Sequence, residues 1–178
     1  MRSKSRFISS LFDLARMELK DVVDKVENCE AFKAFRHQHP EAFLAHSLVL
    51  FDGPSQQWHL GYFDQSKESM MTFIMCDGVI DAVEDKEILR TAHAIMALDA
   101  ASVKLSSEDA LKVARDVAAQ HYPHEQIVKT FFVVQVIESQ PVFNITFFTR
   151  AFSTINVHLS TTDGTVGTHS CERLFDYA

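Results

Sequence analysis

Histidine is the residue type in this chain best suited to chemistry, because imidazole binds metal ions and exchanges protons near neutral pH. The chain has nine histidines, and two pairs, His37 with His39 and His121 with His124, fall at the ends of predicted helices. A metal site needs three or four converging ligands, whereas histidines at a helix C-terminus already complement the helix dipole and the last carbonyl groups. The pairs therefore indicate helix ends, and we expect no metal site.

A second compact cluster is formed by His169 and Cys171, which an extended strand would place on one face. A cysteine nucleophile needs a base and a third group that orients the base, and the sequence offers no third group here. The chain also has neither a glycine-rich phosphate-binding motif nor a GxSxG nucleophile motif. We therefore expect no catalytic residue and no cofactor.

Two further histidines occupy the polar positions of strands in which apolar and polar residues alternate. Because successive side chains of a strand point to opposite faces, the polar positions share one face while the apolar ones fill the core. Phe63 and Phe148 have the same phase as the polar residues, and either join this face or pack between the two halves of the chain. The predicted surface for a ligand or partner comprises His59, Phe63, Asn144, Phe148, Asn156 and His158.

The composition predicts a cytoplasmic globular protein. Of the 178 residues, 47% are hydrophobic, which suffices for a core. Cys29, Cys76 and Cys171 show no disulfide or zinc spacing, which is typical of free thiols in a reducing compartment. A net charge of −7 without a basic stripe argues against nucleic acid as a partner. The chain has no apolar run long enough for an integral membrane segment.

Residues 1–16 form a basic N-terminal extension with apolar residues at helical spacing. Its apolar run, Phe7 to Ala15, is short and interrupted by Asp13, and no small-residue cleavage site follows, so we predict no signal peptide. A helix packed on the body, a mobile extension and a weak membrane-surface helix are the alternatives for this segment.

Residues 17–83 contain two helical patterns followed by three strand-like runs. Apolar residues at helical spacing mark the two helices, and polar turns separate the strands. The helices are Glu18–Val26 and Glu30–Gln38, and the strands are Ala42–Phe51, Trp58–Phe63 and Met70–Cys76. Residues 84–105 then predict a linking helix, whose apolar pattern starts at Val83, and a connector.

Residues 106–178 repeat this order. Ser106 and Asp109 resemble a capping box at the start of an amphipathic helix, and a tail follows the last strand. The strand-like runs are Lys129–Ile137, Phe143–Phe148 and Ile155–Ser160. Trp58 aligns with Phe143, and an Asp-Gly turn closes each half, which predicts a duplication. We expect an α+β fold of two αβββ units, each a helix on an antiparallel three-stranded meander, with extra N-terminal and linking helices.

The second unit resembles the PepSY module, a small αβββ domain. Its Glu108, Ala110 and Ala114 are similar to the helix pattern of that family, and Phe143-Asn144-Ile145 and Asp163-Gly164 are similar to its aromatic strand and final turn. The first unit is similar through Trp58, Leu60 and Asp77-Gly78. The resemblance implies tandem αβββ domains. The layout, with its start at Met17, is also similar to small cytosolic prokaryotic proteins, which imply no activity.

These features together predict a non-catalytic binding or regulatory protein that engages a protein partner through an exposed sheet face or edge. The alternative is a small-ligand carrier or enzyme with a pocket between helix and curved sheet, as in cystatin-like and nuclear-transport-factor-like folds. A homodimer through edge strands is a third hypothesis. The strands direct Phe, Ile, Val, Leu and Trp inward, which favours a filled core and therefore the binding hypothesis.

Overall fold

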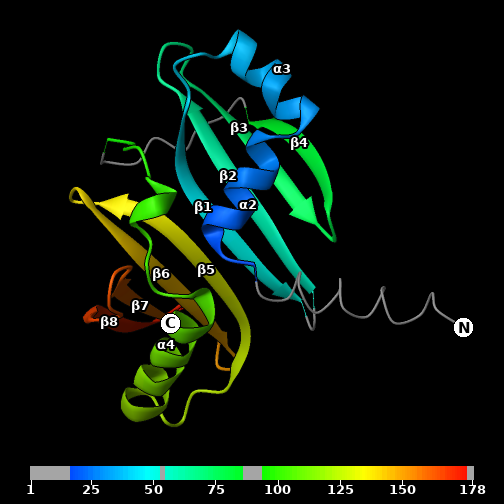
Figure 1. The fold of residues 1–178 in the computed structure, drawn as a ribbon. Helices are drawn as coiled ribbons and strands as arrows, with labels where there is room; N and C mark the ends of the chain where they lie inside the picture. Colours follow the sequence, from blue (N-terminus) through cyan, green and yellow to red (C-terminus); the bar gives the residue numbers. More distant parts are fainter. Residues whose placement is uncertain (1–16, 53–54, 86–93, 176–178) are drawn as a thin grey trace, which may run out of the picture.

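The fold is built on one eight-stranded antiparallel sheet (Figure 1). The computed structural model of the chain describes residues 17–52, 55–85 and 94–175. The strands are β1 (Phe43–Asp52), β2 (Ser55–Asp64), β3 (Ser69–Cys76), β4 (Val79–Asp85), β5 (Ile127–Ile137), β6 (Gln140–Thr149), β7 (Ser153–Ser160) and β8 (Val166–Arg173). The described helices are α2 (Leu19–Glu27), α3 (Glu30–Gln38), α4 (Ser107–His121) and the 3-10 helix η1 (Ala100–Ser102).

The two halves of the chain meet in the middle of the sheet, where β1 pairs with β5. The strand order is β4-β3-β2-β1-β5-β6-β7-β8, so each half is a four-stranded meander. The junction, which we call the β1–β5 seam, runs antiparallel from the pair His46 and Gln135 to the pair Leu50 and Phe131. Because backbone pairing continues across the seam, both halves belong to the same sheet.

Local sequence signals explain where the helices begin. In α2 the residues Leu19, Val22, Val23 and Val26 follow the i, i+3, i+4, i+7 spacing, and all four are buried. At the start of α4 the Ser106 hydroxyl accepts a hydrogen bond from the Asp109 backbone N–H at 3.0 Å. The structure therefore confirms the helices predicted around Glu18–Val26, at Glu30–Gln38 and after Ser106.

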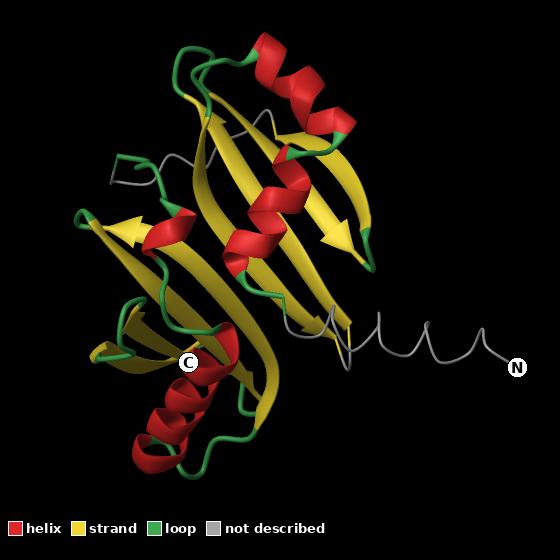
Figure 2. Ribbon diagram, in the orientation of Figure 1, coloured by secondary structure: helices red, strands yellow, loops and turns green. Residues whose placement is uncertain are grey.

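All three described α-helices cover the same face of the sheet (Figure 2). Alternate residues of the central strands point toward them and form one hydrophobic core. Its largest fully buried side chains include Trp58, Tyr62, Phe73, Phe132, Phe143 and Phe147. The second face of the sheet has no described helix, and this asymmetry defines the site discussed below.

The prediction of two αβββ units, in the manner of PepSY or cystatin-like modules, is wrong. The Asp-Gly turns at Asp77 and Asp163 do not close the units; each leads into a fourth strand, β4 or β8. β4 and β8 are the edge strands, and they carry many polar and charged residues, as edge strands commonly do. These residues interrupt the alternation of apolar and polar positions by which a strand is recognised in a sequence. The result is one continuous sheet and a structure that is mostly strand.

The predicted linking helix is also not observed where the structure describes the chain. Its first residues, from Val83, belong to β4, and residues 94–99 are not helical. The rest of that prediction, residues 86–93, lies outside the described residues, as does the predicted extension 1–16.

The turn between β6 and β7 holds Phe152 in a conformation that glycine or asparagine usually adopts. Its φ of 57° lies in the left-handed region, and the residue is 59% exposed. Replacing Phe152→Asn should raise the free energy of unfolding by about 0.5–1 kcal/mol, because asparagine tolerates this conformation while other residues are strained by about 1–2 kcal/mol. Urea denaturation measures the difference.

Phe175→Asn is the matched control for this prediction. Phe175 is similarly exposed, at 62%, but is not among the residues with positive φ. We expect no stabilisation from the control, and an equal gain in both variants would show that the loss of an exposed ring, rather than the relief of backbone strain, is responsible.

Candidate functional site

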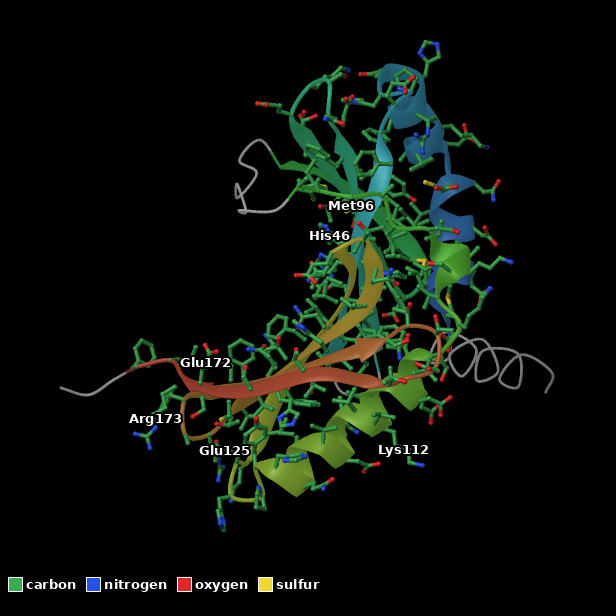
Figure 3. The ribbon with its side chains drawn as sticks, turned by 90° about the vertical axis from the view of Figure 1, so that its left-hand side faces the viewer. His46, Met96, Lys112, Glu125, Glu172 and Arg173 are labelled. Carbon is green, nitrogen blue, oxygen red and sulfur yellow. The ribbon has the colours of Figure 1, made fainter. Side chains whose placement is uncertain are left out.

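The face of the sheet opposite the helices, which we call the open face, is the candidate site. In Figure 3, α2 and α3 lie to the right of the upper strands and α4 lies below the lower ones; the open face, with His46 labelled, is on the side opposite α2 and α3, to the left. Directly paired residues on neighbouring strands point to the same side. One such row, the central row, crosses the sheet through Asp81, Ile74, His59, Leu48, Val133, Asn144, His158 and Thr168.

The structure brings all six residues of the predicted binding surface to the open face. His59, Asn144 and His158 belong to the central row, and Asn156 pairs with Thr146 in the row beside it. Phe63 and Phe148 lie on β2 and β6 at the same phase as His59 and Asn144. The alternation of the strands thus predicted a shared face correctly, while the role of these residues as a site stays a prediction.

Two of the three open-face pairs of the seam are apolar, and the third is the polar pair His46 and Gln135. Leu48 pairs with Val133 across the seam, and Leu50 pairs with Phe131 in the next row. These side chains are only partly buried, although all four are apolar. An apolar strip of this kind along the centre of a sheet is a feature of surfaces that another molecule covers.

Phe63 and Phe148 do not pack between the two halves, which was one of the two alternatives for them. Phe63 contacts Phe43 of its own half edge-on, with ring centroids 5.7 Å apart. Phe148 contacts Phe131, which belongs to the same second half, in the same way, at 5.1 Å. Each pair therefore extends the open face on its own side of the seam.

Two polar atoms in the central row lack hydrogen bonds. The Nε2 atom of His59 and the Oδ1 atom of Asn144 are buried and have no partner among the described residues. Burial of a polar atom without a hydrogen bond costs about 1–3 kcal/mol. In the register His59 lies between Leu48 and Ile74, and its burial lowers the pKa of its imidazole.

Sequence reasoning missed His46, which also lies on the open face. A β-bulge between Leu44 and His46 shifts the phase of β1, and the apolar run Ala42–Phe51 shows no clear alternation. The His46 ring lies over Gly61 of β2: a Cβ atom added to Gly61 would lie 2.3 Å from its Cε1 atom. Only a glycine at position 61 leaves room for the His46 ring. A glycine in the strand opposite His46 was therefore the feature of the sequence that could have placed His46 on this face.

The low pKa of His59 predicts a loss of stability in acid. The imidazole has a lower pKa in the folded protein than its ordinary value of 6.5. The contribution of the neutral imidazole to the free energy of unfolding is therefore complete above pH 6.5 and is lost as the pH falls through the folded pKa. A His59→Leu variant should lose less stability than the wild type when urea unfolding is compared at about pH 7.5 and 5.

His158→Leu provides the control, because His158 lies in the same row. We expect this variant to retain the acid-induced loss of the wild type. If His59→Leu and the wild type lost the same stability, the inferred effect of His59 burial would be wrong.

The histidine pair at the end of α3 serves a structural contact. His37 is exposed, whereas His39 Nδ1 lies 2.8 Å from Oδ2 of the buried Asp64, and its ring stacks on Phe35. The other Asp64 oxygen accepts hydrogen bonds from the Ser66 hydroxyl and backbone N–H. The cluster joins the end of α3 to the turn between β2 and β3, a contact that the predicted role of the pair at the helix end did not include.

A second histidine cluster lies where the C-terminal end of α4 meets β8. The rings of His121 and His169 are 4.3 Å apart, and the Tyr122 hydroxyl lies 2.8 Å from His169 Nδ1. His169 and Cys171 share a face, as predicted, and it is the helix-side face, because they pair with the buried Val157 and Ile155. Burial raises the pKa of the Cys171 thiol, so this cysteine is a poor nucleophile.

The cluster does not form a metal site. Across residues 17–52, 55–85 and 94–175, no group of three or more His, Cys, Asp or Glu side chains has a geometry that could hold a metal ion. All three cysteines are free. Among the described helices, none combines the length and apolar character that crossing a membrane requires.

Comparisons with known proteins identify the type of fold and do not extend to function. No family model matches the chain, and no curated protein matches it, so the resemblance to PepSY modules stays a prediction. The chain is similar to the crystal structure of a "putative lipoprotein" from Clostridium difficile 630, with a TM-score of 0.54 and 11% identity. The match covers 80% of this chain and 91% of that chain, and at this identity it shows the fold alone.

Proposed function

We propose that the protein is a non-catalytic binding protein that engages a protein partner through the open face of its sheet. The central row is the observation that supports this best. Leu48 and Val133 form an apolar, partly buried pair at the seam, and the polar residues His59 and Asn144 flank it. Protein interfaces combine an apolar centre with a polar rim.

The filling of the helix side supports a partner over the alternative of a ligand pocket. Trp58, Phe132 and Phe143 are fully buried between the helices and the sheet, where a pocket of the cystatin-like kind would have to lie. Large side chains packed at protein density leave little volume for a ligand. The open face is therefore the better candidate for binding.

Photo-crosslinking in the native host tests the proposal. A photoreactive amino acid replaces Leu48 on the open face or, as the control, Lys112, which is exposed on α4 and points away from the sheet (Figure 3). We expect a covalent protein adduct that forms from position 48 and not from position 112. Identical adduct patterns from both positions, or none from position 48, would contradict the proposal.

A further inference from the structure

We infer that the partner of the open face is a second copy of this chain, bound face to face about a two-fold axis along the β1–β5 seam; this rests on the proposed function of that face. The strand order places β2 and β6 at equal distances on either side of the seam. A two-fold axis along the seam exchanges them, so β2 of one copy lies over β6 of the other. Such an interface is isologous, since each copy contributes the same surface.

The positions of His59 and Asn144 agree with this axis. His59 lies on β2 and Asn144 on β6, and the register places them in the same row with Leu48 and Val133 between them. The axis therefore brings His59 of each copy opposite Asn144 of the other. The axis thus sets a polar residue against a polar residue on each side of the apolar pair Leu48 and Val133.

The neighbouring rows are self-complementary under the same axis. Leu50 and Phe131 pair across the seam within one chain. The axis therefore places Leu50 of each copy opposite Phe131 of the other, and both are apolar. Farther from the seam, Gln57 on β2 of one copy faces Thr146 on β6 of the other, and both residues are polar. Apolar residues thus meet at two of the three open-face pairs of the seam, and His46 meets Gln135 at the third.

Charge and area also fit a second copy. Among the residues whose side chains the structure describes, the charged ones of the open face are Asp81, Lys129 and Glu172; they lie on edge strands or near a strand end and are exposed, so these three do not bring like charges into the centre of the dimer. Eight strands about 4.8 Å apart and about 27 Å long present roughly 900 Å² per copy. A typical stable interface buries about 800 Å² per partner.

Sedimentation velocity over a wide concentration series tests the inference with the full chain. We expect a dimer for the wild type, and Val133→Glu should weaken it at least about a hundredfold, because it buries a charge on each side of the interface. Val128→Glu is the matched control on the same strand, where the valine is already 59% exposed, and it should leave the dimer unchanged. A wild type that stays monomeric at every concentration would overturn the inference, as would a dimer insensitive to Val133→Glu.

A crosslink between copies tests the axis itself and does not depend on how well Val133→Glu folds. In a background in which Cys29, Cys76 and Cys171 are replaced by serine, a His59→Cys chain is mixed with an Asn144→Cys chain. Facing sheets lie about 10 Å apart, beyond the reach of a disulfide, so a short bis-maleimide is used. Crosslinked dimers should form in the mixture and not in either chain alone; equal crosslinking in all three samples would overturn the axis.

The photo-crosslinking experiment separates failure of this inference from failure of the proposed function. An adduct from position 48 with twice the mass of the chain supports the second copy. An adduct of position 48 with a different protein overturns the second copy while the proposed binding role of the open face stands.

Discussion

Trp58→Ala and Phe143→Ala are each expected to lower the free energy of unfolding by about 3–5 kcal/mol. Trp58 is 1% exposed and Phe143 is 0% exposed, and each lies in the second strand of its half. Trp58 pairs with Val49 and Met75, which are also buried. The Phe143 ring lies 5.1 Å from the ring of Phe132. Truncation to alanine removes the buried apolar surface and leaves a cavity that the rigid sheet cannot close.

A conservative variant distinguishes lost packing from other effects. The indole Nε1 of Trp58 is buried without a hydrogen-bond partner among the described residues, so Trp58→Phe removes an unpaired donor along with part of the ring. We expect it to cost about 1–2 kcal/mol less than Trp58→Ala. Urea denaturation monitored by circular dichroism measures all three variants. A loss below about 1 kcal/mol for either alanine variant would refute the core position.

Asp64→Ala should lower the free energy of unfolding at neutral pH by about 3 kcal/mol. Asp64 is 2% exposed and accepts hydrogen bonds from the Ser66 hydroxyl at 2.6 Å and from the backbone N–H groups of Ser66 and Lys67. His39 contacts its other oxygen. Alanine would remove the acceptor that these donors of the exposed Ser66 and Lys67 share and would separate the end of α3 from the β2–β3 turn.

The loss of stability caused by Asp64→Ala should disappear in strong acid. The Ser66 hydroxyl, together with His39 and two backbone N–H groups, lowers the pKa of Asp64 from 3.8 to about 2. Because the folded pKa is below the unfolded one, this stabilisation is complete above about pH 4 and is lost as the pH falls toward 2. Urea unfolding of the wild type and Asp64→Ala across this range should therefore give curves that converge in acid.

Asp163→Ala is the control for Asp64. Asp163 is exposed in the β7–β8 turn, where its carboxylate accepts a hydrogen bond from the Thr165 N–H at 3.0 Å. An exposed turn contact of this kind should be worth less than about 1 kcal/mol. Equal losses in the two variants, or an Asp64 effect that persists unchanged at low pH, would contradict the role assigned to the buried carboxylate.

Local patterns predicted the local structure well. Helix boundaries such as Glu30–Gln38 follow from apolar spacing and from a cap or a proline at the ends, which are properties of a few adjacent residues. The shared face of His59 and Asn144 follows from strand alternation for the same reason. Where the alternation is interrupted, as at the bulge before His46, the prediction failed.

The prediction of αβββ units failed for a related reason. β4 and β8 are edge strands whose sequences are largely polar, so burial imposes little pattern on them. The Asp-Gly turns were recognised correctly as turns, but a turn signal does not show whether a further strand follows. The predicted duplication stays a prediction, although the strand order is symmetric about the seam.

The sequence by itself determined the three described α-helices, the phase of the central strands and the set of six side chains on one sheet face, because these depend on periodicities of two or 3.6 residues. Only the tertiary structure decided that β1 pairs with β5 and that Leu48 lies beside Val133. This pairing joins residues far apart in the chain, and backbone hydrogen bonds between strands are the same for every sequence. Strand partners are therefore selected by the packing of the whole sheet, which no local pattern encodes.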